Sequence, residues 1–430
     1  MWKDENGEWN VINIVSFVCI FVVFLFILFA MYLRIRYRFF YKVRDMYVIY
    51  QYYNLLYAPY KPINTYRKLE YLKKHVSAYD IKVHSVQEKS DTELDALLDT
   101  LTTFVKKHSI RVKHQVDYSC EVDREYMRNI VCHHEKPSYI ACHYDLYKDV
   151  KSLFALFPVY VYEHRQKSKS MMYYIDYSVT LPKYRHQESI MILSTTTGVE
   201  IMKRYVDEEY PDKETSSMGF LFKTEHTKLP IMPLLSYKSI VYDLDSVSFV
   251  ESLLGYEKTT RFEPLQLIRV DKNNIRIFKD IFKYVLEKKN YTRMFCVTTG
   301  YTNLYDCILQ NVIHVYMIMM KDEVYGMFLF KDIRYAYKKE PMIECIASFW
   351  FEKKHDSRDL TIDLYLWCLY DLKRIHRFRY IVLNVLGENW KLFDSLTRRG
   401  LLGLYHVPCY YYAINYIQKP YSSEESFMMV

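Results

Sequence analysis

An uncharged apolar run at residues 11–33 constrains the fold of this chain more than any other feature. At ~1.5 Å per residue, a helix over this run is long enough for the ~30 Å hydrocarbon core of a bilayer. Arg34, Arg36 and three further bases follow within eleven residues, whereas residues 1–10 carry one base and three acids. By the positive-inside rule, we expect a single-pass membrane protein with its N-terminus outside or lumenal and its C-terminal part in the cytosol.

A cleaved signal peptide is the alternative interpretation of this run. The length of the run, the acids before it and the lack of a small-residue cleavage site disfavour that interpretation. The nine cysteines of the chain are scattered without the spacing of a disulfide framework, which favours a reducing compartment such as the cytosol.

Composition narrows the class of protein further. Half of the 430 residues are apolar, which suffices for one large hydrophobic core or two medium ones. The net charge of +8 is modest and no arginine-rich tract is present, so we expect no nucleic-acid partner. Cys132-His133-His134 and Cys142-His143 match no common zinc spacing, and we expect no bound metal.

The pattern of apolar residues after the run predicts a basic, tyrosine-rich stalk at 34–90 and an α/β (α+β) body. We expect helices at 91–107, 189–204, 276–287, 359–374 and 389–398, and strands near 138–146, 152–162, 171–180, 218–223, 312–320, 323–330, 342–351, 379–386 and 408–416. Because helix, strands, helix and strand follow one another twice, two halves of similar plan are indicated, at 91–250 and 251–430.

One strand, loop and helix run from Tyr174 to Leu193. Aromatic and β-branched side chains favour a mostly buried strand, and Pro182 ends it because proline has no amide hydrogen for a ladder. A charged turn follows, and Ser189 is a suitable N-cap for the next helix. A basic loop at a helix N-terminus is a potential phosphate site, since unpaired amides point at the anion.

This stretch resembles, without a gap, the E-I-N-F-L-C-V-H-K-K-L-R-S-K-R-L-A segment of the N-myristoyltransferases (glycylpeptide N-tetradecanoyltransferases). Further matches follow in the same order over residues 91–430. Val116 to Ser119 resembles F-D-Y-S, Ala141-Cys142 stands near W-H-C-G-V, Lys223 to Pro230 is similar to Y-T-A-G-V-V-L-P, Phe262 to Leu286 follows the opening of the second half, Ala347 to Trp350 resembles Y-S-F-Y, Val382 to Leu386 resembles V-F-N-A-L, and Cys409 to Tyr416 resembles L-Q-Y-Y-L-Y-N-W.

The resemblance implies a duplicated GNAT-type acyl-CoA N-acyltransferase fold, with acyl-CoA bound by the first half and peptide largely by the second. It implies attack of an N-terminal glycine amine on a myristoyl thioester. The amides of Tyr177 and Ser178 are then the oxyanion donors, and Thr224 helps to hold the amine. The carboxylate of Val430 is then the base, although a frayed terminus is the ordinary alternative for last residues. Asp176 replaces the family's asparagine, as a second base or as a charge that repels the first.

The same resemblance assigns the ligand contacts. Lys183, Arg185 and the amides from His186 through Gln187, Glu188 and Ser189 to Ile190 are the expected contacts to CoA, although Gln187 and Glu188 stand where the family has cations. Tyr118, Trp350, Asn384 and His406 are the expected substrate contacts. Myristoyl-CoA is then a co-substrate, with no permanently bound cofactor.

We therefore expect a monomeric, membrane-anchored acyltransferase. An inactive relative that binds acyl-CoA, lipid or a protein partner is the alternative. An acetyltransferase of another acceptor class is the third possibility.

Overall fold

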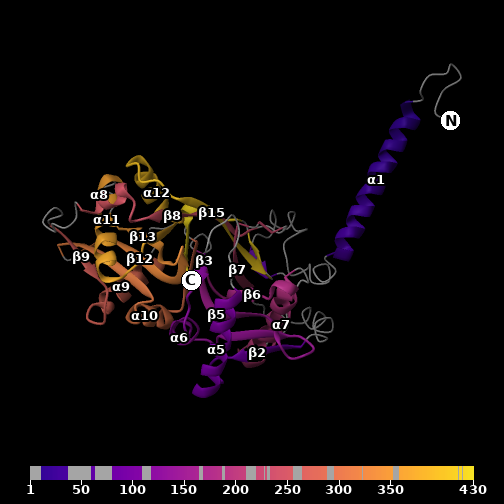
Figure 1. Cartoon of the computed structure of the whole chain (residues 1–430), viewed down its shortest axis with the longest axis horizontal. Helices are drawn as coiled ribbons and strands as arrows, with labels where there is room; N and C mark the ends of the chain where they lie inside the picture. The colour runs from indigo at the N-terminus through magenta and orange to yellow at the C-terminus, as the bar shows by residue number, and fades with distance from the viewer. Residues whose placement is uncertain are drawn as a thin grey trace.

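A computed structural model describes residues 11–36, 60–62, 80–108, 118–163, 168–185, 189–209, 219–226, 228–229, 233–254, 264–287, 295–321, 323–351, 358–414, 416–418 and 420–430. Helix α1 (Val11–Arg36) stands apart from a mixed α/β body, as Figure 1 shows. All of its described side chains from 15 to 32 are exposed, and its apolar window is long enough to cross a membrane.

The first half of the body contains β2 (Ile81–Ser85), α5 (Asp91–His108), β3 (Tyr118–Cys120), α6 (Arg124–Val131), β4 (Tyr139–Tyr144), β5 (Val150–Glu163), β6 (Ser168–Thr180), the 3-10 turn η2 (Pro182–Tyr184), α7 (Ser189–Glu209), β7 (Gly219–Glu225) and β8 (Leu235–Asp243). Strand β1 (Tyr60–Pro62) pairs with β16 in a separate ribbon.

The second half contains α8 (Val247–Leu254), β9 (Leu265–Arg269), α9 (Ile275–Glu287), β10 (Phe295–Thr299), α10 (Tyr301–Leu309), β11 (Ile313–Met320), β12 (Glu323–Tyr337), β13 (Glu340–Trp350), α11 (Arg358–Ile375), β14 (Tyr380–Asn384), α12 (Asn389–Arg398), β15 (Tyr405–Ile414), β16 (Tyr416–Gln418), the 3-10 turn η4 (Ser423–Glu425) and β17 (Ser426–Met429).

The two halves repeat one plan. In the first, β4, β5 and β6 pair antiparallel, α7 crosses over, and β7 returns parallel to β6. In the second, β11, β12 and β13 pair antiparallel, α11 crosses over, and β14 returns parallel to β13. The predicted α/β fold with two similar halves is thus confirmed.

The halves share one large sheet of fifteen strands. Strand β15 joins them because it pairs with β7 on one side and with β8 on the other, while β8 pairs with β14. Two further pairings join the halves: β10 pairs with the C-terminal part of β5, and β3 pairs with the end of β12. The core between the halves is therefore continuous.

Two boundaries differ from those expected from the sequence. Strand β2 pairs with β4, so the body begins before residue 91, within the segment interpreted as a stalk. Its short alternation of Ile81 and Val83 is easily missed at the end of a basic segment. The boundary at 250 and 251 falls inside α8, whose Phe249 and Leu253 pack in the core of the second half.

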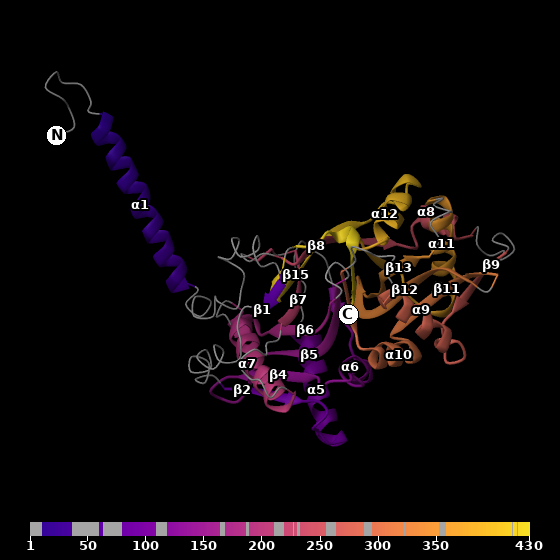
Figure 2. The same cartoon turned by 180° about the vertical axis from the view of Figure 1, so that it is seen from behind.

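The last ten residues, 421–430, form a C-terminal tail that lies inside the body. Strand β17 pairs parallel with β10, and Phe427, Met428 and Met429 are each no more than 2% exposed. Figures 1 and 2 both place the C-terminus between the two halves. The apolar end of the chain accounts for this burial, since a solvated tail gains nothing from such side chains.

Gly387 is the tightest contact of this tail. It has a φ of +51°, and a Cβ there would lie 2.2 Å from Phe427 Cε1. Gly400 is the matched control, because its φ is +74° and nothing lies within 4 Å of its Cβ position. We expect Gly387→Ala to destabilise the body by about 1–2 kcal/mol more than Gly400→Ala in urea unfolding. Equal effects would show that the tail does not press on Gly387.

Candidate active site

A fork opens between β6 and β7. Their parallel pairing runs from Met172 with Gly219 to Ile175 with Phe222 and stops there. Strand β6 nevertheless continues to Thr180, and β7 continues to Glu225 while pairing with β15. The residues from 176 onward thus lie along a strand edge that β7 no longer covers, which is where an extended ligand has access to backbone groups.

A β-bulge lies at the start of this fork. In the β5–β6 register, Leu153 faces Val179 and Ala155 faces Asp176, so Tyr177 and Ser178 together oppose one residue. Tyr177 has a φ of +51°, and its amide donates to Asp176 Oδ1 at 2.8 Å. The bulge takes both predicted oxyanion amides out of the regular ladder, but a carboxylate already accepts from one of them.

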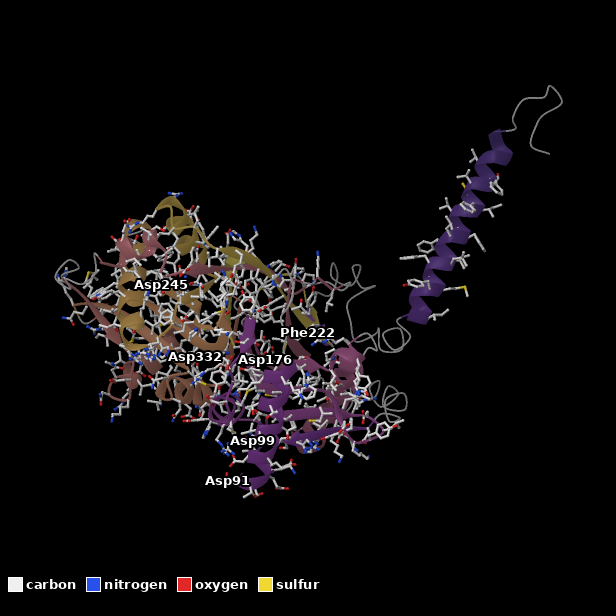
Figure 3. All side chains as sticks on the ribbon, in the orientation of Figure 1. Asp91, Asp99, Asp176, Phe222, Asp245 and Asp332 are labelled. Carbon is white, nitrogen blue, oxygen red and sulfur yellow. The ribbon has the colours of Figure 1, made fainter. Side chains whose placement is uncertain are left out.

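The side chain of Tyr177 points into the body and connects the bulge to the second half. Its hydroxyl bonds to that of Tyr126, which donates to the carbonyl oxygen of Asp332 at 2.9 Å. Burial raises the pKa of both tyrosines well above the usual value, so both remain neutral. Figure 3 shows Asp176 and Asp332 in the central part of the body, where the halves meet.

Val430, the predicted base, lies in this central region. It packs against the hydrophobic cluster that contains Tyr177, Phe157 and Met429. It also lines a small cavity together with side chains of α6, β5, α10, β11 and β12. The frayed-terminus alternative is therefore wrong for residues 426–429.

A charged cluster lies on the face of β7 that is turned toward the core containing Tyr177. The sequence patterns did not predict it. The ammonium of Lys223 is 3.2 Å from Glu225 Oε1 and 4.0 Å from Glu344 Oε1. Asn384 donates to Glu344 at 2.7 Å and accepts from Ser239 at 2.5 Å. Burial alone would lower the pKa of Lys223, but the two carboxylates outweigh burial and hold that pKa well above its usual value.

Thr224 does not share this face. Side chains alternate along a strand, and its hydroxyl bonds to that of Tyr412, in the core cluster next to α7. The structure therefore brings Val430 and the bulge into one core but turns the Thr224 side chain away from it. In the alignment of Lys223 to Pro230 with Y-T-A-G-V-V-L-P, His226 stands at the glycine. Its φ of 60° lies in the region that favours glycine, which agrees with this alignment.

The predicted CoA loop is partly described. Arg185 donates to the carbonyl oxygens of Thr180 at 3.1 Å and of His108 at 3.0 Å, so it fastens the loop. The Lys183 ammonium lies 4.7 Å from the Tyr184 ring centre. His186, Gln187 and Glu188 lie outside the described residues, as do the side chains of Ser189 and Ile190.

The four predicted substrate residues are separated in space. Asn384 belongs to the charged cluster, whereas Trp350 packs with Phe328 and Tyr325 toward the core of the second half. Tyr118 packs against Tyr337 and Tyr405, and the exposed His406 lies beside Phe393. Only Asn384 reaches the cluster around Lys223.

The candidate metal ligands are engaged elsewhere. His134 Nε2 lies 2.8 Å from the Ile130 carbonyl oxygen, and His133 lies 3.4 Å from Asp306. Within the described ranges, no group of three or more His, Cys, Asp or Glu side chains is arranged to hold a metal ion.

Comparison with known proteins finds structures of similar fold but finds no protein that is similar in sequence. No family model matches the chain, and no curated protein matches it by sequence. Three structures of Saccharomyces cerevisiae N-myristoyltransferase match at 10% identity, with TM-scores of 0.58, 0.60 and 0.59. They cover 80%, 86% and 86% of this chain and 85%, 88% and 89% of theirs, and each was solved with bound myristoyl-CoA. The resemblance seen in the sequence motifs is thus confirmed at the level of the fold.

Proposed function

We propose that this chain transfers a fatty acyl group from acyl-CoA to the N-terminal glycine amine of a peptide or protein. The observation that carries the proposal is the buried C-terminus. Ordering the last residues costs conformational entropy, and Val430 packs against the same core cluster as Tyr177 of the bulge, so a chemical role for the tail would account for its burial. A terminal carboxylate that acts as a base is such a role.

The reaction needs three groups. An N-terminal amine has a pKa of about 8, so its ammonium must lose a proton before attack. The carboxylate of Val430 takes that proton first, and the neutral nitrogen then bonds to the thioester carbon. When the carbon–sulfur bond breaks, a second proton passes from the nitrogen to the sulfur, and CoA leaves as its thiol. Backbone amides at the bulge of Tyr177 and Ser178 stabilise the oxyanion between these two steps.

The charge of the cluster around Lys223 suits a cationic substrate end. Two carboxylates, Glu225 and Glu344, face one ammonium there, which leaves one negative charge. Such a charge attracts an N-terminal ammonium to the central region.

If helix α1 is a membrane anchor, the proposed reaction takes place at a membrane surface. If α1 spans a bilayer with the basic residues after 33 on the cytosolic side, the body lies where an acylated product partitions into lipid. An anchored enzyme then releases its product at the membrane surface.

One observation favours a second function, an inactive module that binds acyl-CoA. The Tyr177 amide donates to Asp176, so the carboxylate occupies one of the two oxyanion donors. A negative charge at this point opposes a second negative charge in the transition state. A fold that retains the fork but cannot stabilise the oxyanion would bind a thioester without cleaving it.

The test uses the full chain in detergent micelles with myristoyl-CoA and peptides that begin with glycine. The same peptides with an acetylated N-terminus are the matched control. We expect CoA release and acylated peptide only with a free glycine amine. Binding of acyl-CoA without turnover would favour the inactive module, and the absence of both would contradict the proposal.

A further inference from the structure

The turn between β4 and β5 carries the two most exposed large apolar side chains of the described residues. Leu146 is 96% exposed and Tyr147 is 87% exposed, and no other such side chain in the described ranges exceeds 75%. Single exposed apolar side chains are common on protein surfaces, but these two are adjacent and almost free of protein neighbours. They form an apolar tip that the fold itself leaves uncovered.

The carboxylate of Asp145 holds this tip in one conformation. Its Oδ1 accepts from the amides of Tyr147 at 2.9 Å and Asp149 at 3.0 Å, and its Oδ2 accepts from the Tyr184 hydroxyl at 3.1 Å. The amide of Lys148, at a φ of 68°, donates to the Asp145 carbonyl oxygen at 3.1 Å. Because the turn is already fixed, little further backbone entropy is lost when its tip binds a partner.

A basic surface surrounds the tip. The ammonium of Lys151 lies 5.3 Å from the centre of the Tyr184 ring, and that of Lys183 lies 4.7 Å from it. Arg185 donates to a carbonyl oxygen at the end of α5, which brings two exposed lysines of that helix to the same loop. The bases of this surface are Lys82, Lys106, Lys107, Lys148, Lys151, Lys183 and Arg185, and its acids are Asp80, Asp145 and Asp149. Seven bases against three acids leave a local charge of +4.

An anionic bilayer surface matches this combination of side chains. Tyrosine is enriched at membrane–water interfaces, where its ring lies at the depth of the headgroups, and leucine favours the acyl boundary beneath. Basic side chains at that depth are attracted by acidic phospholipids. A protein partner needs a broader surface, since specific interfaces bury about 1,200–2,000 Å² and two side chains supply only a fraction of that area.

Helix α1 supplies an independent reason for a membrane partner. Its apolar window from Val15 to Tyr32 is long enough to span a bilayer, and none of it is buried. A single anchor leaves the orientation of the body undetermined, because the 23 residues from 37 to 59 between α1 and β1 reach up to ~80 Å when extended. A second contact on the body would fix that orientation.

We propose that the β4–β5 turn is a second membrane contact, in which Leu146 and Tyr147 enter the interface of an anionic bilayer and the surrounding bases bind its headgroups. The proposal rests on the membrane anchor of the proposed function and does not depend on acyl transfer. Tyr184 joins the turn to the predicted CoA loop, so the contact brings that loop to the surface into which a long-chain acyl-CoA partitions.

The test places a tryptophan at the tip of the full chain, in vesicles whose lipids carry brominated acyl chains. Bromine quenches tryptophan emission only on contact, and the native chain supplies the background of its five tryptophans. We expect the added emission of Tyr147→Trp to fall about threefold in phosphatidylcholine vesicles that contain about one-third phosphatidylserine, and much less without the acidic lipid. A further change, Leu146→Asp, should abolish this quenching, because acidic lipid repels a carboxylate. Urea unfolding checks that these exposed substitutions leave the fold intact.

The matched control is Tyr284→Trp, at a 42% exposed position on α9 in the second half. We expect no quenching there. Quenching at residue 284 but not at residue 147 would place the membrane face on the second half and overturn the proposal. A tip that is unquenched by bromine in both lipids but shielded from a soluble quencher would also overturn it, and would indicate a protein partner.

Two further readouts separate this proposal from the proposed function. Flotation of the chain with the vesicles reports on the anchor alone, so a chain that fails to float would contradict the anchor and, with it, the second contact. Acyl transfer in the same vesicles reports on catalysis. Transfer without quenching at the tip would overturn the second contact and leave the proposed function standing, whereas quenching without transfer would do the reverse.

Discussion

One glycine added after Val430 should reduce the single-turnover rate of acyl transfer by about 10²–10³-fold. The extension moves the carboxylate by one residue, beyond the space that the buried tail occupies beside Phe157 and Lys331. The peptide group that replaces it is not a base. Loss of a positioned general base typically costs 10²–10⁴-fold, and the remaining groups still bind and orient the reactants.

The matched control for this extension is Val430→Leu, which keeps the carboxylate in place and changes only the partly buried side chain. We expect its rate to stay within about fivefold of the native rate, because the substitution adds one methylene to a partly exposed side chain and leaves the carboxylate unchanged. Urea unfolding of both variants checks that β17 still pairs with β10. An unchanged rate in a well-folded extended chain would exclude the terminal carboxylate as the base.

Asp176→Asn should increase the rate of acyl transfer about thirtyfold. The carboxylate that accepts from the Tyr177 amide carries its charge next to the proposed oxyanion position. Two like charges about 4 Å apart at a partly solvated site repel by a few kcal/mol, and about 2 kcal/mol of relief corresponds to thirtyfold. The asparagine carbonyl still accepts from the same amide, so the bulge is retained.

Asp245→Asn is the control for a general effect of charge. Asp245 pairs with Lys373 and lies far from Asp176 in Figure 3. It should leave the rate unchanged within about twofold, since exposed charges at such distances are screened. A tenfold or greater loss in Asp176→Asn would instead identify Asp176 as a base, which the sequence comparison left open.

Much of the architecture was predictable from local pattern. The helices at 91–107, 276–287 and 389–398 agree with the structure to within a residue at each end, because amphipathic spacing and cap residues act locally. The buried tail was also predictable, since Phe427-Met-Met-Val430 is too apolar for a solvated end. Both features depend on residues that are close together in the chain.

The chemistry of the central region was less predictable because it depends on strand register. Lys223 and Glu225 are two apart on one strand, which does place them on one face, but Glu344 joins them from a strand over a hundred residues away. The same alternation turns Thr224 toward Tyr412. The small cavity lined by Lys331 and Val430 is equally non-local, and no motif marks it.

The most direct test of the central claim is the mass of a glycine peptide after incubation with the full chain and myristoyl-CoA. The proposal predicts a peptide that carries one myristoyl group, with fragment ions that place it on the α-nitrogen of the first residue. It also predicts one equivalent of free CoA thiol for each acylated peptide. An unmodified peptide, in the presence of folded protein that binds acyl-CoA, would contradict the account.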